Sequence, residues 1–126
     1  MTTKKHINDL HAEIKEWQSQ VSLTMDEIKA FKKQLGEIVS KNTEPEAVAK
    51  AEHFENQFRH QLEVFDDLSD ELALVDEALG KRAQHNGSAD HVLLDDQPVL
   101  RDKAQTSVHI FTELKNEFRA YEQKWF

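Results

Sequence analysis

The amino-acid sequence predicts an all-α protein in which three long amphipathic helices form an antiparallel three-helix coiled-coil bundle. Three observations support this fold class. Apolar residues recur at helical spacing in three separate segments, and in the first of them they follow a seven-residue repeat. The chain has only three Gly and two Pro in 126 residues, fewer than a turn-rich β protein needs. Hydrophobic residues still make up 38% of it, more than a disordered chain would contain.

The first helix is expected over residues 4–40, where the heptad pattern is unbroken. Its expected core positions form two series offset by three residues, with one polar member, Thr24: Ile7, Ile14, Val21, Ile28 and Leu35, then Leu10, Trp17, Thr24, Phe31 and Ile38. A 3.5-residue period sustained this long predicts one apolar face and left-handed supercoiling against partner helices. Gly36 falls on the outward side, where it costs about 1 kcal/mol relative to Ala.

The second helix is expected over residues 44–82. Thr43 is followed three residues later by Glu46, which predicts a capping box, and Pro45 suits the first helical turn because it lacks an N–H. The expected core positions follow at spacings of three and four residues, with a slight slip near Leu62: Ala51, Phe54, Phe58, Leu62, Phe65, Leu68, Leu72, Val75 and Leu79.

The end of the second helix has two alternative stop signals, Gly80 and Asn86-Gly87. We favour a well-packed helix to about residue 80 that frays or continues to about residue 86. Residues 87–97 are then a connector rich in helix breakers and caps. Part of this connector is expected to tuck under the end of the bundle, because it carries the apolar run Val92, Leu93 and Leu94.

The third helix is expected over residues 97–125. Pro98 suits a helix start, and Asp95 or Asp96 can act as the N-cap. The expected core positions again have helical spacing and reach almost to the last residue: Leu100, Ala104, Val108, Phe111, Leu114, Phe118, Tyr121 and Trp125.

Short connections between the helices make neighbours antiparallel. Folding about residues 41–42 predicts that Phe31 lies near Ala51, and folding about residue 89 predicts that Phe65 lies near Phe111. Aromatic residues are expected to gather at the end next to the first turn: Phe31, Phe54, Phe58, Phe118, Tyr121 and Trp125. A central layer is expected to contain three more: Trp17, Phe65 and Phe111.

The three heptad helices, with Trp17 in the first, resemble a single spectrin-type repeat. The resemblance implies a shared architecture and carries no function with it. At this length the whole chain, residues 1–126, is expected to form one domain.

The net charge of −8 is concentrated in residues 43–86, which hold eleven acidic and only four basic residues. Binding to nucleic acid requires clustered Lys and Arg facing phosphate, and an anionic membrane surface requires a similar basic patch. We therefore expect neither nucleic acid nor membrane as a partner. One small basic patch in the first helix is expected to face two glutamates of the second: Lys29, Lys32 and Lys33 at the level of Glu52 and Glu55.

Cysteine is absent, which excludes disulfides, thiolate metal sites and a cysteine nucleophile, and which fits a reducing compartment. No stretch approaches the roughly 20 apolar residues that span a bilayer. The expected location is therefore cytoplasmic.

Seven histidines raise the question of a metal site. A di-iron site in a helical bundle uses Glu-x-x-His motifs, and no His here has a Glu three residues before it. His53 and His60 share a helix face but lie two turns apart, about 10 Å, which is too far to share one ion. Since there is also no Gly-rich phosphate loop and no Ser/His/Asp set, we expect no enzyme activity, no cofactor and no metal.

An acidic run without basic residues marks the second helix: Glu63, Asp66, Asp67, Asp70, Glu71, Asp76 and Glu77. Several apolar residues fall outside the expected core: Leu23, Met25, Leu74, Ile110 and residues 92–94. From these two sets we predict a partner surface: Glu63, Asp66, Asp67, Asp70, Glu71, Leu74, Leu23 and Met25. Such a surface would be used either by a protein partner or in self-association.

The leading functional hypothesis is a non-enzymatic helical bundle that acts as a protein-protein interaction or oligomerisation module, with a homodimer, including a helix-swapped one, as an expected form. The alternative is a small-molecule-binding or metal-binding bundle that uses surface histidines or the aromatic end cluster.

Overall fold

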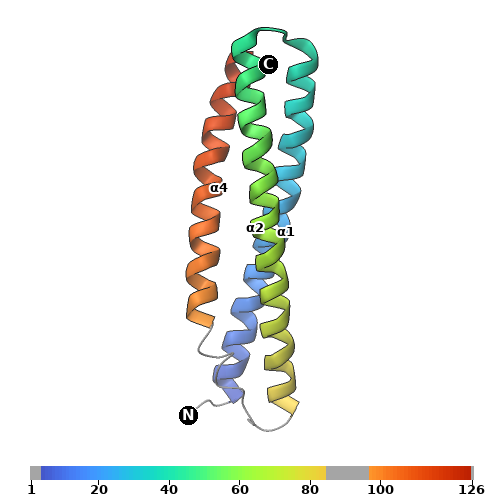
Figure 1. The fold of residues 1–126 in the computed structure, drawn as a ribbon. Coiled ribbons are helices and arrows are strands. Elements are labelled where there is room, and N and C mark those ends of the chain that lie inside the picture. Colours follow the sequence, from blue (N-terminus) through green and yellow to red (C-terminus); the bar gives the residue numbers. More distant parts are fainter. Residues whose placement is uncertain (1–3, 85–96, 126) are drawn as a thin grey trace.

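The computed structural model describes residues 4–84 and 97–125, which form three long α-helices and no strand. The helices are α1 (Lys4–Lys41), α2 (Pro45–Gln84) and α4 (Gln97–Trp125). α2 runs antiparallel to α1, and α4 returns alongside both in the direction of α1 (Figure 1). The predicted all-α antiparallel three-helix bundle is therefore confirmed.

The second helix continues through Gly80 to Gln84, two residues beyond the predicted bound of 82 and within the predicted continuation to about residue 86. Packing explains this: Leu79 is buried, and tertiary contacts of an apolar face outweigh the propensity cost of one glycine. The other predicted stop, Asn86-Gly87, and the expected tucking of Val92–Leu94 lie outside the described residues.

The turn between α1 and α2 differs from the predicted capping box. The Val48 N–H donates to the Glu44 carbonyl at 3.0 Å, so Glu44 is the N-cap and Pro45 is the first helical residue. The predicted capping box, with Thr43 as the N-cap, therefore begins one residue too early. The Glu46 carboxylate instead accepts a hydrogen bond from Lys124 of α4, at 3.1 Å.

Asn42 ties the end of α4 to this turn. Its backbone N–H and its side-chain amide both donate to the Ile38 carbonyl at 3.0 Å, which closes the end of α1. The same amide donates to the Trp125 carbonyl at 2.7 Å, and so satisfies a carbonyl at the C-terminal end of α4 that has no partner inside its own helix. One side chain therefore caps two helices.

The buried residues of α2 keep strict heptad spacing, without the predicted slip: Ala47, Ala51, Phe54, Phe58, Gln61, Phe65, Leu68, Leu72, Val75 and Leu79. Gln61 occupies the core position that the sequence pattern assigns to Leu62, which is half-buried beside it. In α4 the core position likewise falls on Ser107, and Val108 is half-buried. The geometry of the helix explains both cases. Turning Leu62 or Val108 to the core position would rotate its whole helix by about 100°, and the other buried residues of that helix would leave the core.

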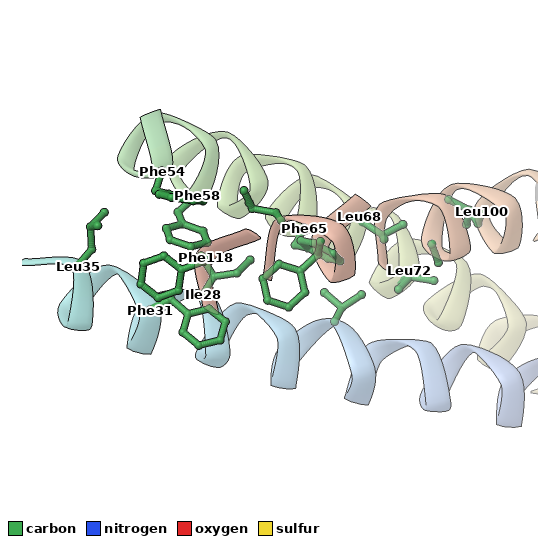
Figure 2. Close-up of a cluster of buried hydrophobic side chains, with 14 of the residues drawn as sticks. Ile28, Phe31, Leu35, Phe54, Phe58, Phe65, Leu68, Leu72, Leu100 and Phe118 are labelled. Atoms are coloured by element: carbon green, nitrogen blue, oxygen red, sulfur yellow. The ribbon is translucent and has the colours of Figure 1, made fainter. Parts of the chain in front are cut away.

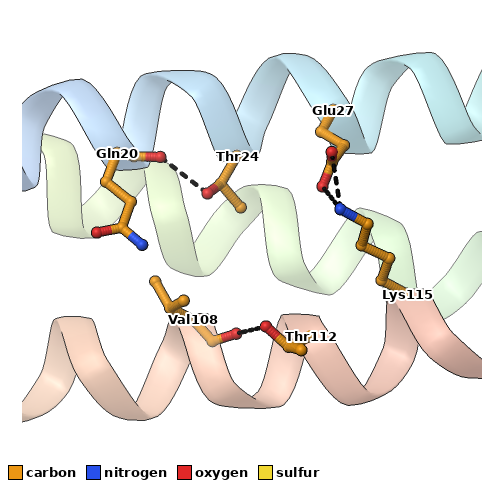
Figure 3. A network of polar contacts seen from close by, with 6 residues as sticks. All are labelled: Gln20, Thr24, Glu27, Val108, Thr112 and Lys115. Carbon is orange, nitrogen blue, oxygen red and sulfur yellow. Dashed lines mark hydrogen bonds and ion pairs between the residues drawn. The ribbon is translucent and has the colours of Figure 1, made fainter.

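Each helix therefore carries one polar residue in its core face: Thr24, Gln61 and Ser107. The Thr24 hydroxyl donates to the carbonyl of Gln20 one turn earlier, at 2.8 Å (Figure 3). The side-chain oxygen of Gln61 is buried and has no hydrogen-bond partner among the described residues. A buried polar atom without a partner destabilises the fold, because it has lost its water.

The end of the bundle next to the α1–α2 turn is filled by aromatic rings, as predicted (Figure 2). Phe118 lies at the centre, with ring centroids 5.2 Å from Phe31, 5.3 Å from Phe54 and 5.1 Å from Phe58. The predicted neighbourhood of Phe65 and Phe111 is confirmed, with centroids 6.4 Å apart. Trp17, by contrast, is only half-buried at the edge of the core.

The ring of Phe31 lies 6.0 Å from that of Phe58, which is further along α2 than the predicted neighbour Ala51. The turn is centred on residues 42–44 rather than 41–42, and α1 is correspondingly longer. This difference moves the partner of Phe31 further along α2.

Ion pairs hold α4 in register with α1. Arg101 forms two hydrogen bonds with the Glu13 carboxylate, at 2.6 and 2.9 Å, and Lys115 forms two with Glu27, at 2.9 and 3.0 Å (Figure 3). Both pairs span 88 positions in the sequence, so the offset between the parallel helices is constant along this length. Hydrogen bonding to Glu13 and the charge of its carboxylate raise the pKa of Arg101.

Tyr121 offers a test of packing at the aromatic end, because it is the one tyrosine of the chain. It is buried, and its hydroxyl donates to the Ala47 carbonyl at 2.8 Å. Burial raises the pKa of Tyr121 above its ordinary value of 10.0. The contribution of the Tyr121 phenol to the free energy of unfolding is therefore fully present below pH 10. This contribution is lost as the pH rises through the folded-state pKa.

We expect ultraviolet titration of the phenol to give a higher midpoint for the folded protein than for the urea-unfolded chain. Equal midpoints would show that Tyr121 is exposed to water in solution.

Candidate docking site

A groove of about 600 Å³ runs along the outer side of the α1–α2 pair, near the turn that joins the two helices. Its apolar and small lining residues come from both helices: Leu35, Gly36, Val39, Val48 and Ala51. Its rims are polar and charged: Lys32 on α1, and Glu52, Glu55, Asn56 and Arg59 on α2. All of the lining residues come from α1 and α2, and none of them comes from α4.

The groove exists because small residues occur at one level of both helices. Gly36 has no side chain, and a Cβ placed there would meet no atom within 4 Å. Ala51 has a short side chain at its buried position, and Val39, which also lines the groove, is 38% exposed. Further along the same helix pair, the half-buried Met25 and Leu62 pack against the core.

The two rims of the groove differ in charge. On α2, Glu55 lies 3.6 Å from Lys32 across the groove and 3.5 Å from Arg59 on its own helix. Two further exposed lysines of α1, Lys29 and Lys33, lie outside the lining of the groove. Within the described part of the chain these two lysines form no ion pair, although they were expected to face glutamates of α2.

A smaller groove of about 340 Å³ lies between α2 and α4 at the same end of the bundle. Its rim is already occupied by contacts within the chain. Lys124 pairs with Glu46 at 3.1 Å, and its ammonium lies 5.0 Å from the centre of the Trp125 ring. The rim of the larger groove also carries an ion pair, Lys32 with Glu55, so the larger groove is preferred for its volume and its apolar lining.

The acidic part of the predicted partner surface lies on the exposed side of α2: Glu63, Asp66, Asp67 and Asp70. Glu71 is half-buried and binds Lys103 of α4 at 2.9 Å, so its charge is used within the bundle. Leu74 follows this acidic face and is 63% exposed.

The structure does not bring the apolar members of that predicted surface together. Leu23 is 67% exposed on α1, whereas Met25 is half-buried and packs against the core. Because Lys32 is level with Glu55, Leu23 is level with residues near 64 of α2, about 15 Å from Leu74 along the bundle axis. Leu23 and Leu74 therefore belong to separate regions, and their role in binding stays a prediction.

The described histidines make contacts that do not converge on a shared centre. The ring of His53 meets that of Phe54, and His109 lies 3.1 Å from Glu113 on its own helix. Nδ1 of His11 lies 2.6 Å from one carboxylate oxygen of Asp76, and Lys15 lies 3.1 Å from the other. In residues 4–84 and 97–125 no group of three or more His, Asp or Glu side chains is placed to hold one metal ion.

These features define the class of the protein as an all-α three-helix bundle with an open groove between two of its helices. None of the helices in the described ranges contains an apolar stretch that could cross a bilayer. No protein-family model matches the chain, and no similar protein was found among curated proteins or solved structures.

Replacing either interior helix glycine by alanine is expected to raise the free energy of unfolding by about 1 kcal/mol, because Ala has the higher helix propensity. Gly36 and Gly80 are both exposed, and a Cβ at either position meets nothing within 4 Å. Urea unfolding followed by circular dichroism measures the change. A loss of stability in Gly36→Ala alone would show that the groove is closed in solution.

Proposed function

We propose that the protein is a non-enzymatic interaction module that docks another protein surface on the groove face of α1 and α2. The observation that supports this proposal is the groove itself, with its apolar floor and charged rims. This pattern matches the anatomy of protein interfaces, in which an apolar centre is surrounded by a polar rim.

An amphipathic helix or another helical bundle would present a row of apolar side chains to the apolar floor of this groove. Burying the exposed part of Val39 and its apolar neighbours contributes about 25 cal/mol per Å². The charges at Lys32, Glu52 and Arg59 would orient a partner and speed its association more than they would add affinity. The rigid helices allow this surface to be preformed before binding.

Filling the groove without disturbing the core tests the proposal. Gly36→Leu places a side chain in the open space, and Gly80→Leu is the matched control at an exposed helix glycine outside the groove. Circular dichroism first checks that each variant is folded. Each variant is then used as bait to capture partners from a lysate of the source organism. Its mass in solution is measured separately by light scattering behind a sizing column.

We expect wild type and Gly80→Leu to form the same complex, and Gly36→Leu to lose it. That complex should re-form from purified components. A complex that survives in Gly36→Leu, or the lack of any complex with wild type, would overturn the proposal. Stoichiometric metal found by elemental analysis of tag-free protein would also count against a purely interactive role.

A further inference from the structure

We infer that the protein has a second docking surface, on the outer side of the α2–α4 pair, and that its partner there is a basic amphipathic helix of another protein. This inference goes beyond the proposed function, which uses the groove on α1 and α2. It is carried by exposed apolar side chains and unpaired carboxylates that the fold gathers from α2 and α4.

An ion pair fixes the level at which α2 and α4 meet. Lys103 of α4 lies 2.9 Å from Glu71 of α2, and the two helices run in opposite directions (Figure 1). Leu74 follows Glu71 by three positions and Val99 precedes Lys103 by four, so each is a neighbour of the ion pair on the surface of its own helix. Both steps lead the same way along the bundle, so Leu74 and Val99 are level to within about 2 Å.

Apolar residues also lie one heptad away on the other side of this ion pair. Val64 precedes Glu71 by seven positions and Ile110 follows Lys103 by seven, so heptad packing places Val64 and Ile110 opposite each other as well. Val64 is half-buried. The other three apolar side chains are open to solvent: Leu74 (63% exposed), Val99 (65%) and Ile110 (46%). These four residues form an apolar row about 16 Å long, interrupted by the ion pair.

Exposed carboxylates border the apolar row on both helices. Each lies three or four positions from one of the residues above: Asp67 from Glu71, Asp70 from Leu74, and Asp102 from Val99. Within residues 4–84 and 97–125, none of these three carboxylates has an ion pair or a hydrogen bond. The nearby lysines are already paired: Lys103 with Glu71 at 2.9 Å, and Lys81 with Glu77 at 3.3 Å. The border of the row is therefore negatively charged.

This combination of apolar and acidic groups selects the kind of partner. An amphipathic helix presents apolar side chains at spacings of three and four residues, and three of its turns match a row of about 16 Å. The unpaired carboxylates attract Lys and Arg and repel an acidic partner. They also repel the phosphates of nucleic acid and of an anionic membrane. A basic amphipathic helix satisfies both the apolar row and its border.

The probe for this surface is a fluorescent synthetic peptide of about 18 residues, long enough to form a helix, with Leu on one face and Lys on the rest. Fluorescence anisotropy measures its binding. We expect wild type to form a one-to-one complex, and a matched peptide with Glu in place of Lys to stay unbound. The variants D67K/D70K and L74S/V99S are each expected to weaken binding at least about tenfold, because each removes one half of the recognition.

The control for charge is D26K/E37K, which reverses two exposed carboxylates of α1 and changes the net charge equally. The control for exposed apolar residues is Leu23→Ser, also on α1. Both controls should bind the peptide as wild type does. Gly36→Leu should do so too, because the groove on α1 and α2 is a separate site, and this separates failure here from failure of the proposed function.

A wild type that does not bind the Leu/Lys peptide would overturn the inference. So would equal losses in D67K/D70K and D26K/E37K, because overall charge alone would then attract the peptide. Light scattering behind a sizing column gives a further outcome: a wild-type dimer that L74S/V99S converts to single chains would assign the surface to a second copy of this chain and reject the basic partner.

Discussion

Replacement of Phe118 by Ala is expected to lower the free energy of unfolding by about 3–5 kcal/mol, the largest effect of any single change considered. Phe118 is fully buried, and its ring centroid lies within 6.1 Å of those of four other aromatic rings: Phe31, Phe54, Phe58 and Tyr121. Removing it leaves a cavity at the centre of this cluster, and the three helices cannot close the cavity without breaking their register. The loss is a large share of the roughly 5–15 kcal/mol by which a domain of this kind is stable.

Urea unfolding followed by far-ultraviolet circular dichroism measures this loss. The control is Ile110→Ala, an apolar truncation on the same helix at a position that is 46% exposed. We expect the control to change stability by less than about 1 kcal/mol. A Phe118→Ala variant as stable as this control would mean that the aromatic end is not packed in solution.

Replacement of Gln61 by Leu is expected to raise the free energy of unfolding by about 1–3 kcal/mol. Gln61 is only 4% exposed, and its side-chain oxygen is buried without a partner among the described residues. Leu removes this unsatisfied group and adds apolar contacts at a core position. The neighbouring core residues Phe58 and Phe65 are fully buried and apolar, so they suit the new side chain.

The matched control is Gln57→Leu, the same exchange on the exposed side of the same helix, for which we expect a change within about 0.5 kcal/mol. Thermal and urea unfolding of both variants give the comparison. A clear loss of stability in Gln61→Leu would show that the amide is satisfied in solution, for example by a bound water molecule.

Most of the fold could be predicted from the sequence, because heptad spacing reports directly which face of a helix is buried. The bounds of α1 and α4 were predictable within a residue, since the apolar pattern begins and ends close to those points. The error at Leu62 has a physical cause. Hydrophobicity favours Leu62 over Gln61, but the rotation of the whole helix is set by Phe58, Phe65 and the residues beyond them, and Gln61 is buried with them.

The groove was harder to predict. The sequence places Gly36 on the outward side of the first helix, yet an outward glycine says nothing about what lies beside it. The open space arises only when Gly36 meets Ala51 and Val48 of the second helix at one level. That level depends on the turn, which the sequence pattern places too early. The predicted partner surface had the same weakness, because exposure could be inferred for Leu23 and Leu74 but not their separation in space.

The proposed function requires one arrangement of the helices, in which α4 packs on α1 and α2 of the same chain and leaves the groove face open. Zero-length carbodiimide cross-linking of mixed light and isotope-labelled protein tests it most directly. We expect amide links at three pairs within one chain: Lys115 to Glu27, Lys103 to Glu71 and Lys124 to Glu46. The same three links found between light and heavy chains would show that the helices are exchanged between molecules, and would contradict the account.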